Sequence, residues 1–258
     1  MNADTVRGLL LRLCLPALFI AIWYFFTEIV PITHPTLLPS PVAVVRFFLR
    51  VVSNGELFEH AKASLTRIFF ANAAALALGV PLGLAMGLSR NVERMLDGLL
   101  SIFRPIPPLA WVPLAILWLG IGATSVVFIT FLAAFFAILL NTIAGARAVD
   151  KLHIRAALSL GANRRRLMTH VVLPTVTSHI FTGFRTAIGV SWMSIVAAEL
   201  IAASSGLGYM IIYYREVLRT DAIIVGMLTI GFIGLVMDIA ARRLEQWLLP
   251  WRQMVRLP

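Results

Sequence analysis

Six long apolar segments, separated by short polar stretches, dominate the hydrophobic pattern of the chain. Each is close to the roughly 20 residues that an α-helix needs to cross a bilayer. The six segments are Leu9–Val30, Ile68–Leu88, Leu99–Leu119, Val126–Ala146, Val176–Ala198 and Ala222–Ala241. The pattern predicts an all-α, polytopic membrane protein with about six transmembrane helices in a single domain covering residues 1–258.

The composition supports a membrane protein and excludes a soluble one. Hydrophobic residues make up 60% of the 258 residues and charged residues 13%, and the mean hydropathy is +0.90. So much apolar surface cannot be hidden inside one soluble globule of this size. The formal net charge of +10 does not indicate nucleic-acid binding, because the basic residues collect at the boundaries of the apolar segments.

The distribution of Lys and Arg predicts the orientation in the membrane, since cytoplasmic loops keep positive charge. With the N-terminus inside, fourteen of the 22 Lys and Arg residues fall in cytoplasmic segments. Six, Arg67 among them, fall in external segments. We therefore expect both termini and the polar stretch 147–175 on the cytoplasmic side.

The N-terminal third contains two further features. The first apolar segment follows Arg7 and Arg12 as a signal sequence would, but it reaches Val30 without a small-residue cleavage pattern, so we interpret it as a retained span. Between residues 31 and 62, several prolines and the amphipathic Val42–Leu49 predict an external loop with an interfacial helix.

The polar stretch 147–175 has the features of two short helices joined by a sharp turn. Asp150 and Asn163 have the side chains of N-cap residues, and Gly161 permits a change of direction between them. Pro174 suits the first turn of the next span because it needs no amide donor. On these grounds alone, an ordinary basic cytoplasmic loop is an equally good interpretation.

The spacing of residues in this stretch resembles a known family signature. The matching residues are Ala156, Ala157, Gly161, Leu173 and Pro174. The signature is the Glu-Ala-Ala loop of the permease subunits of binding-protein-dependent ABC importers, with Arg155 where that family usually has glutamate. In the family this loop sits in a groove of a separate ATP-binding subunit. A salt link made by that glutamate is therefore not expected in this chain.

Further motifs resemble the nitrate, sulfonate and taurine branch of these permeases. They are Ser64–Arg67, Arg104–Trp111 and Gly120–Gly122, so the resemblance covers nearly the whole length. Three others, Ile154–Ala157, Val196–Ala203 and Gly206–Gly208, are most similar to taurine permeases. The resemblance implies a type I ABC importer permease in the bacterial inner membrane, with 147–175 as its coupling loop.

The resemblance also implies partners and a mechanism. The family arrangement is two permease copies, two ATP-binding subunits and a periplasmic substrate-binding protein. ATP and Mg²⁺ would bind to the partner subunit, and this chain would hold no cofactor of its own. We expect a small sulfonate-type anion, taurine above all, to cross by alternating access, with aliphatic sulfonates and nitrate as the alternatives.

Several residues in or near the apolar segments are candidates for a transport pathway or gate. Prolines in the third segment, Pro107 and Pro108 among them, should bend or break it, which is tolerated only against protein or water. A simple packing kink is the alternative. Trp111 is a further candidate for the pathway, although Trp near a span end more often anchors the interface.

The fifth segment contributes the remaining candidates. Arg185 is costly in lipid and should face the bundle interior, where it would attract an anion or pair with an acid. Glu199 lies at the outer end of this segment, and the following Ser205 and Gly206 suit a turn or a short re-entrant gate. A plain solvated loop is the competing interpretation.

Catalysis and metal binding find little support. The five histidines are scattered over different segments without metal-ligand spacing, and the one cysteine, Cys14, can form neither an internal disulfide nor a multi-cysteine site. The Gly-Lys-Ser/Thr ending of a phosphate-binding loop is absent, so this chain cannot hydrolyse ATP by that route. An ion-coupled carrier or channel is the alternative of another class, although intramembrane acids are few and lie near span ends.

Overall fold

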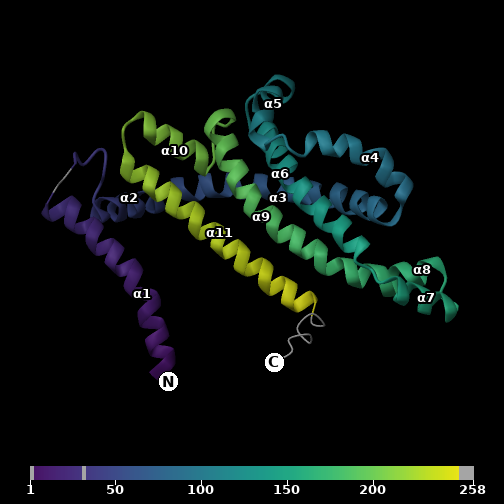
Figure 1. Cartoon of the computed structure of the whole chain (residues 1–258). Coiled ribbons are helices and arrows are strands. Elements are labelled where there is room, and N and C mark those ends of the chain that lie inside the picture. The colour runs from purple at the N-terminus through teal and green to yellow at the C-terminus, as the bar shows by residue number, and fades with distance from the viewer. Residues whose placement is uncertain (1–2, 31–32, 250–258) are drawn as a thin grey trace.

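The computed structural model describes the backbone of residues 3–30 and 33–249, and the side chains of residues 14–30, 33–150, 152–163 and 165–249. All regular structure in these residues is helical (Figure 1). In chain order the elements are α1 (Ala3–Tyr24), η1 (Phe25–Ile29), α2 (Pro41–Ser53), α3 (Glu56–Leu88), α4 (Arg90–Phe103), η2 (Pro108–Trp111), α5 (Val112–Leu119), α6 (Ala123–Arg147), α7 (Lys151–Ser159), α8 (Arg164–Leu167), η3 (Met168–Val172), α9 (Leu173–Ala202), α10 (Leu207–Glu216) and α11 (Thr220–Leu248).

Four helical runs in the described residues are long and apolar enough to cross a membrane. They are Glu56–Leu88, Ala123–Arg147, Arg165–Ala202 and Thr220–Leu248. A fifth span is formed if α4 and the η2–α5 segment count together, although an 83° bend separates them. The first predicted span coincides with α1 and η1, of which the part Cys14–Ile29 is a shorter apolar helix.

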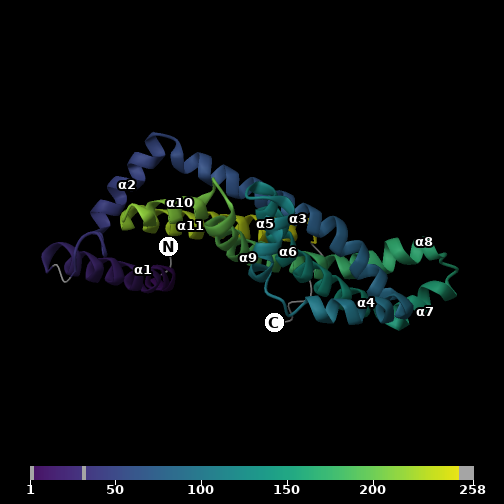
Figure 2. The ribbon, with the colours of Figure 1, turned by 90° about the horizontal axis from the view of Figure 1, so that it is seen from above.

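The central packing unit consists of α3, α6 and α9, which lie against one another along their lengths (Figures 1 and 2). Small residues allow this close approach. A Cβ on Gly87 would lie 2.4 Å from the Ala146 Cβ, and one on Gly145 would lie 2.5 Å from the His179 Cβ. These glycines of α3 and α6 therefore serve helix packing.

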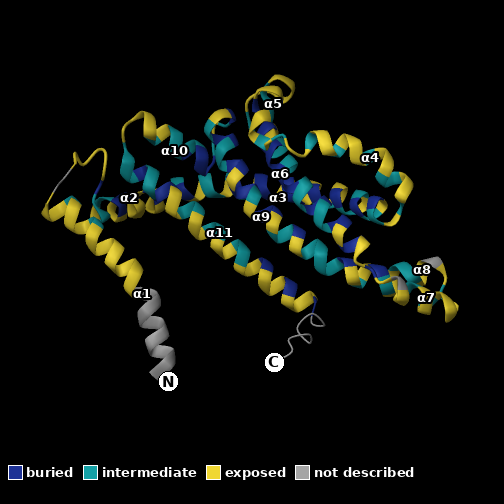
Figure 3. Ribbon diagram, in the orientation of Figure 1, coloured by how far each residue is buried: buried dark blue, intermediate teal, exposed yellow. Residues whose placement is uncertain are grey.

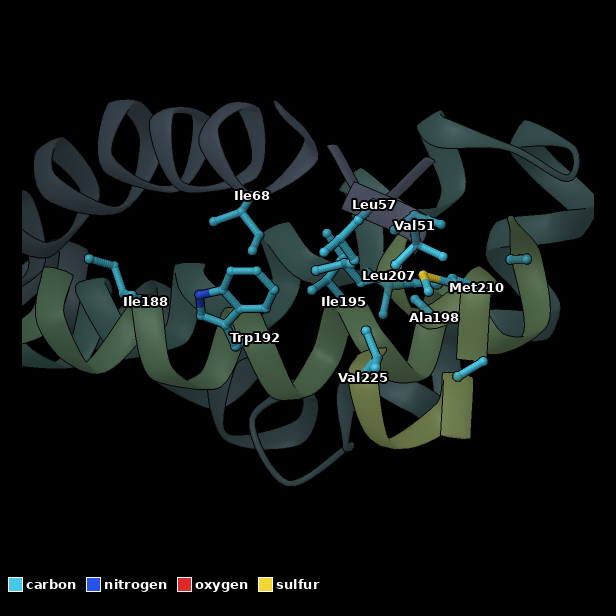
Figure 4. Packing of buried hydrophobic residues seen from close by; sticks show 14 of the residues in the cluster. Val51, Leu57, Ile68, Ile188, Trp192, Ile195, Ala198, Leu207, Met210 and Val225 are labelled. Carbon is cyan, nitrogen blue, oxygen red and sulfur yellow. The ribbon is translucent and has the colours of Figure 1, made fainter. Parts of the chain in front are cut away.

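The largest buried cluster lies where α9 meets α2, α3, α10 and α11. Figure 4 shows Ile195, Ala198, Leu207 and Met210 meeting there, with Trp192 between Ile68 and Ile188. Elsewhere, long parts of the helices are exposed (Figure 3), and many of the exposed residues are large and apolar. Such a surface belongs in lipid or against another subunit rather than in water.

Two boundaries differ from the sequence prediction. The predicted second span starts at Ile68, whereas α3 starts at Glu56, three turns earlier. Arg67, counted with the external charges, therefore lies inside a membrane-length helix and is 6% exposed. The predicted interfacial helix Val42–Leu49 corresponds to α2, which buries Val44, Phe47 and Val51 against the body of the molecule.

Candidate functional site

The stretch 147–175 folds into the predicted helix–turn–helix, here called the hairpin (α7, α8 and their connection). The Asp150 Oδ1 accepts a hydrogen bond of 2.8 Å from the Leu152 amide at the start of α7. The Asn163 Oδ1 accepts one of 2.9 Å from the Arg166 amide at the start of α8. Gly161 between them has φ +75°, a left-handed conformation that favours glycine.

The hairpin presents an apolar and basic surface. Leu160 is 88% exposed and Leu152 69% exposed, and Arg155 and Ala156 are also exposed, whereas Ala157 is half-buried. Within the part of the chain that the structure describes, Arg155 forms no ion pair. The surface is therefore open to a partner.

The base of the hairpin is anchored in the helix bundle. Val149 and Val172 are buried with Ala146 and Val176 at the ends of α6 and α9. The helix of the fifth span does not begin at Pro174. It continues without interruption from α8 through η3 into α9, and Leu173 has an ordinary αR backbone conformation. Pro174, which has no amide to donate, lies in the first turn of α9, one residue after the π-type turn of η3.

A second group of candidates meets around a buried carboxylate at the other end of α9. Glu199 is 1% exposed, and its Oε1 lies 2.7 Å from the Arg67 Nη1. The Ser64 Oγ lies 2.9 Å from both carboxylate oxygens, and the Gly208 amide donates to Oε2 over 2.9 Å. We call Ser64, Arg67 and Glu199, with the contacts they make to residues 205–208, the Glu199 cluster.

The cluster also holds the loop that joins α9 to α10. Arg67 donates from Nη1 to the Ser205 main-chain oxygen over 2.6 Å and from Nη2 to the Ser205 Oγ over 2.7 Å. The Leu207 amide donates to the Ser64 Oγ, and the Gly206 amide to the His60 Nδ1 over 3.1 Å. The competing interpretation of a plain solvated loop is wrong, since this loop is bonded to α3 at several points.

Sequence reasoning named Glu199, Ser205 and Gly206 but missed the residues on α3 that bring them together. Ser64–Arg67 was noted only as a motif, and Arg67 only as an external charge. A signal was present, because Arg67 and Glu199 are opposite charges at the same predicted end of two apolar segments. Such charges inside a membrane-length helix usually pair with one another.

Arg185 lies apart from this cluster and pairs with acids on α11. Its Nη2 is 3.4 Å from the Asp238 Oδ1 and its Nη1 is 3.4 Å from the Glu245 Oε2. Arg242, one turn after Asp238, also pairs with that carboxylate. Of the two predicted roles, pairing with an acid is therefore what the structure shows.

The prolines of the third segment break it, as predicted. Pro107 has an extended ψ of 141°, and Pro108 begins the short η2 turn that contains Trp111. The Trp111 ring lies 5.7 Å from the Phe103 ring across the break. Both rings line an apolar groove of about 740 Å³ between α3, α4, η2 and α6.

Neither group of residues resembles a catalytic or metal centre. Among the described residues, no three His, Cys, Asp or Glu side chains are grouped so as to hold a metal ion. The geometry instead consists of an exposed hairpin and a buried polar cluster at opposite ends of one long helix.

Comparison with known proteins decides the family. The profile described as "binding-protein-dependent transport system inner membrane component" matches residues 79–251. The chain belongs to this family. It is therefore a permease subunit of an ABC importer, a polytopic inner-membrane protein that works with a separate ATP-binding subunit and a substrate-binding protein and is not itself an enzyme. The alternative of an ion-coupled carrier is excluded.

Similar proteins agree with the branch suggested by the motifs. A putative ABC transporter permease of Methanocaldococcus jannaschii is 40% identical, covering 97% of this chain and 95% of the relative. The taurine transport system permease TauC of Escherichia coli is 38% identical, covering 91% and 87%. A putative aliphatic sulfonates transport permease, SsuC of Bacillus subtilis, is 35% identical, covering 97% and 94%. The resemblance to the taurine and sulfonate branch is confirmed.

The fold has solved counterparts. An amino acid ABC transporter crystallised with histidines has a TM-score of 0.60 at 20% identity, over 79% of this chain and 97% of that one. This likeness confirms the all-α, type I importer permease fold.

Proposed function

We propose that this permease carries a small sulfonate-type anion, most specifically taurine, into the cell. The similarity to the taurine permease over 91% of the chain is the observation that carries the proposal. Aliphatic sulfonates are the second candidate, because a permease named for them is 35% identical. Nitrate is the third, on the resemblance of the motifs alone.

The mechanism we propose is alternating access between two copies of this chain. Two ATP-binding subunits, which bind ATP and Mg²⁺, close on ATP and move the two hairpins. Exposed Leu152 and Leu160 would seat in the partner, with Arg155, Ala156 and Ala157 between them. The buried residues at the base of the hairpin would pass the movement to α6 and α9. This chain would bind no cofactor itself.

Pathway residues form part of the same proposal. The broken segment with Pro107, Pro108 and Trp111 would line the route between the copies, and Ser205 and Gly206 would form a gate near the outer end of α9. Arg185 is assigned a structural role, since two carboxylates of α11 already face its guanidinium.

Co-purification followed by reconstituted transport tests the proposal. The tagged chain is purified from its native membrane, and its partners are identified by mass. The recovered complex is then placed in liposomes with the binding protein and supplied with taurine, alkanesulfonates or nitrate. ATP-dependent uptake of taurine is the expected result. Uptake of nitrate alone would overturn the sulfonate assignment, and a complex without an ATP-binding subunit would overturn the mechanism.

A further inference from the structure

The Glu199 cluster lies at the far end of the helix that begins in the hairpin. The helical run from Arg165 to Ala202 is unbroken over 38 residues, which at 1.5 Å per residue is about 57 Å. Figures 1 and 2 both place α7 and α8 at one end of this run and α10 at the other. One continuous helical run therefore joins the hairpin to Glu199.

The bonds of the cluster all cross between separate segments. Glu199 belongs to α9, and Arg67 and Ser64 belong to α3. The third segment is the loop between α9 and α10, together with the first backbone amides of α10. Arg67 binds Glu199 and Ser205 at once, so withdrawing the carboxylate removes the charged partner of the guanidinium and leaves its two hydrogen bonds to Ser205. The guanidinium of Arg67 and the carboxylate of Glu199 thus link three separate segments at one point.

A second bond ties the same end of α9 to the turn before α6. The Gly122 amide donates to the Ala202 main-chain oxygen over 2.8 Å. Ala202 precedes the loop directly, so a shift at the end of α9 also acts on the segment that links the broken third span to α6. The end of α9 that contains Glu199 is therefore bonded directly to the turn between α5 and α6.

Burying a charge pair is a costly way to join helices if joining them is its only role. Apolar side chains of similar volume often give equal or greater stability than a buried ion pair. The two helices already have an apolar interface and a separate neutral contact, the 2.9 Å hydrogen bond from the Asn72 Nδ2 to the Ser191 Oγ. Separating a buried charge pair leaves an uncompensated charge in the interior, so the pair strongly favours the arrangement in which the two partners meet.

We propose that Arg67 and Glu199 are positioning residues that hold the loop of residues 203–206 against α3 in one state of the transport cycle. Movement of the hairpin, carried along α9, withdraws Glu199 and frees the loop. The proposal rests on the proposed function, because it requires ATP-driven transport. Arg67 precedes the region 79–251 that the family profile matches, so the pair joins that region to a segment outside it.

Coupling efficiency in the reconstituted complex provides the first test. Glu199→Gln keeps the side-chain size but removes the negative charge. It also replaces one carboxylate oxygen with an NH2 group, which cannot accept a hydrogen bond from Arg67, Ser64 or Gly208. We expect uptake per ATP hydrolysed to fall about tenfold, while ATP hydrolysis continues. Arg67→Lys keeps the charge and loses the fork to Ser205, so an intermediate loss is expected. Each value is measured on complex that elutes as a single folded species.

Ser191→Ala is the matched control, because it removes a buried polar contact between the same two helices away from the loop. It should lower thermal stability while leaving uptake per ATP unchanged. If Glu199→Gln and Ser191→Ala have the same coupling ratio as the wild type, Arg67 and Glu199 are structural only and the proposal is overturned. A wild-type complex that shows no ATP-driven uptake would instead overturn the proposed function.

A distance measurement on otherwise wild-type protein keeps the proposal testable should the variants fail to fold. Cys14 is replaced by Ser, and spin labels are attached to Thr66→Cys on α3 and Ser204→Cys in the loop, both at exposed positions. The label distance should differ between nucleotide-free complex and complex trapped with ADP and vanadate. Equal distances in the two states would show that the loop does not leave α3, and would overturn the proposal.

Discussion

At the scale of single residues, one carboxylate determines which side chains its neighbours can have. A Cβ on Gly206 would lie 2.2 Å from the Glu199 Oε1, and φ there is +112°. A Cβ on Gly208 would lie 2.6 Å from the Val196 main-chain oxygen. The sequence pattern indicated a turn at these glycines, but the reason for them is the buried Glu199, whose position depends on α3.

Gly206→Ala should therefore destabilise the protein strongly. The methyl group meets a carboxylate held by Arg67 and Ser64, and the backbone is in a region that residues with a Cβ rarely adopt. We expect a loss of about 3 kcal/mol or more, read as a lower midpoint of thermal unfolding in detergent. Gly98→Ala is the control, since a Cβ there meets nothing within 4 Å and should stabilise α4 by about 0.5–1 kcal/mol. Equal midpoints for the two variants would contradict this account.

Tyr214 on α10 gives a prediction about pH. Its hydroxyl donates to the Glu56 Oε1 over 2.7 Å, and burial together with this carboxylate raises the pKa of Tyr214 to about 12. The folded state favours the neutral phenol, so its contribution to stability is complete below the ordinary pKa of 10.0 and is lost as pH rises through about 12. The phenolate absorbance is measured against pH for the wild type and for Tyr214→Phe. The difference between the two curves should show a titration with a midpoint near pH 12. A midpoint near the ordinary value would show that the hydrogen bond does not persist in solution.

At the scale of elements, hydropathy located the helices but not their ends. The first turns of α3 contain Glu59, Lys62 and Arg67, so a search for apolar residues began the span at Ile68 although the helix starts at Glu56. The prolines predicted the break in the third segment because they act locally on the backbone. The 83° angle between its halves depends on tertiary packing, of α4 against α3 and of η2 and α5 against α6, and was not readable from the sequence.

The hairpin was predictable from the sequence, because helix caps and turns depend on residues close to one another along the chain. Gly161 supplies its test: φ is +75°, and a Cβ there would meet nothing within 4 Å. Gly161→Val should cost about 1–2 kcal/mol of local strain and lower uptake per ATP about fivefold, because β-branched residues avoid this conformation. Gly161→Asn, which tolerates the left-handed region, should retain most activity in the same liposome assay. An unchanged Val variant would mean that the turn is not needed for coupling.

At the scale of the whole molecule, the pattern of exposure describes a subunit rather than a complete protein. In the apolar window of α11 only 17% of residues are buried, against 44% in α6. α1 extends away from the bundle in Figure 1. These apolar surfaces need lipid or other subunits, and the sequence alone could not show which helices would be left uncovered, because that depends on how the helices pack.

The orientation in the membrane is the property of the whole molecule most in need of a test. The start of α1, the end of α11 and the hairpin all lie toward the lower side of Figure 1, while α5 and α10 lie toward the upper side. The excess of Lys and Arg at the hairpin and both termini predicts that the lower side is cytoplasmic.

Cysteine labelling in intact cells checks the orientation directly. In a Cys14→Ser background, Ser159→Cys in the hairpin should react with a membrane-impermeant maleimide only after the cells are permeabilised. Asn54→Cys and Ser204→Cys should react in intact cells, since all three positions are exposed and differ only in the side on which they lie. Denatured samples control for intrinsic reactivity. The opposite labelling pattern would place the hairpin outside, where no ATP-binding subunit could reach it, and the coupling mechanism would have to be abandoned.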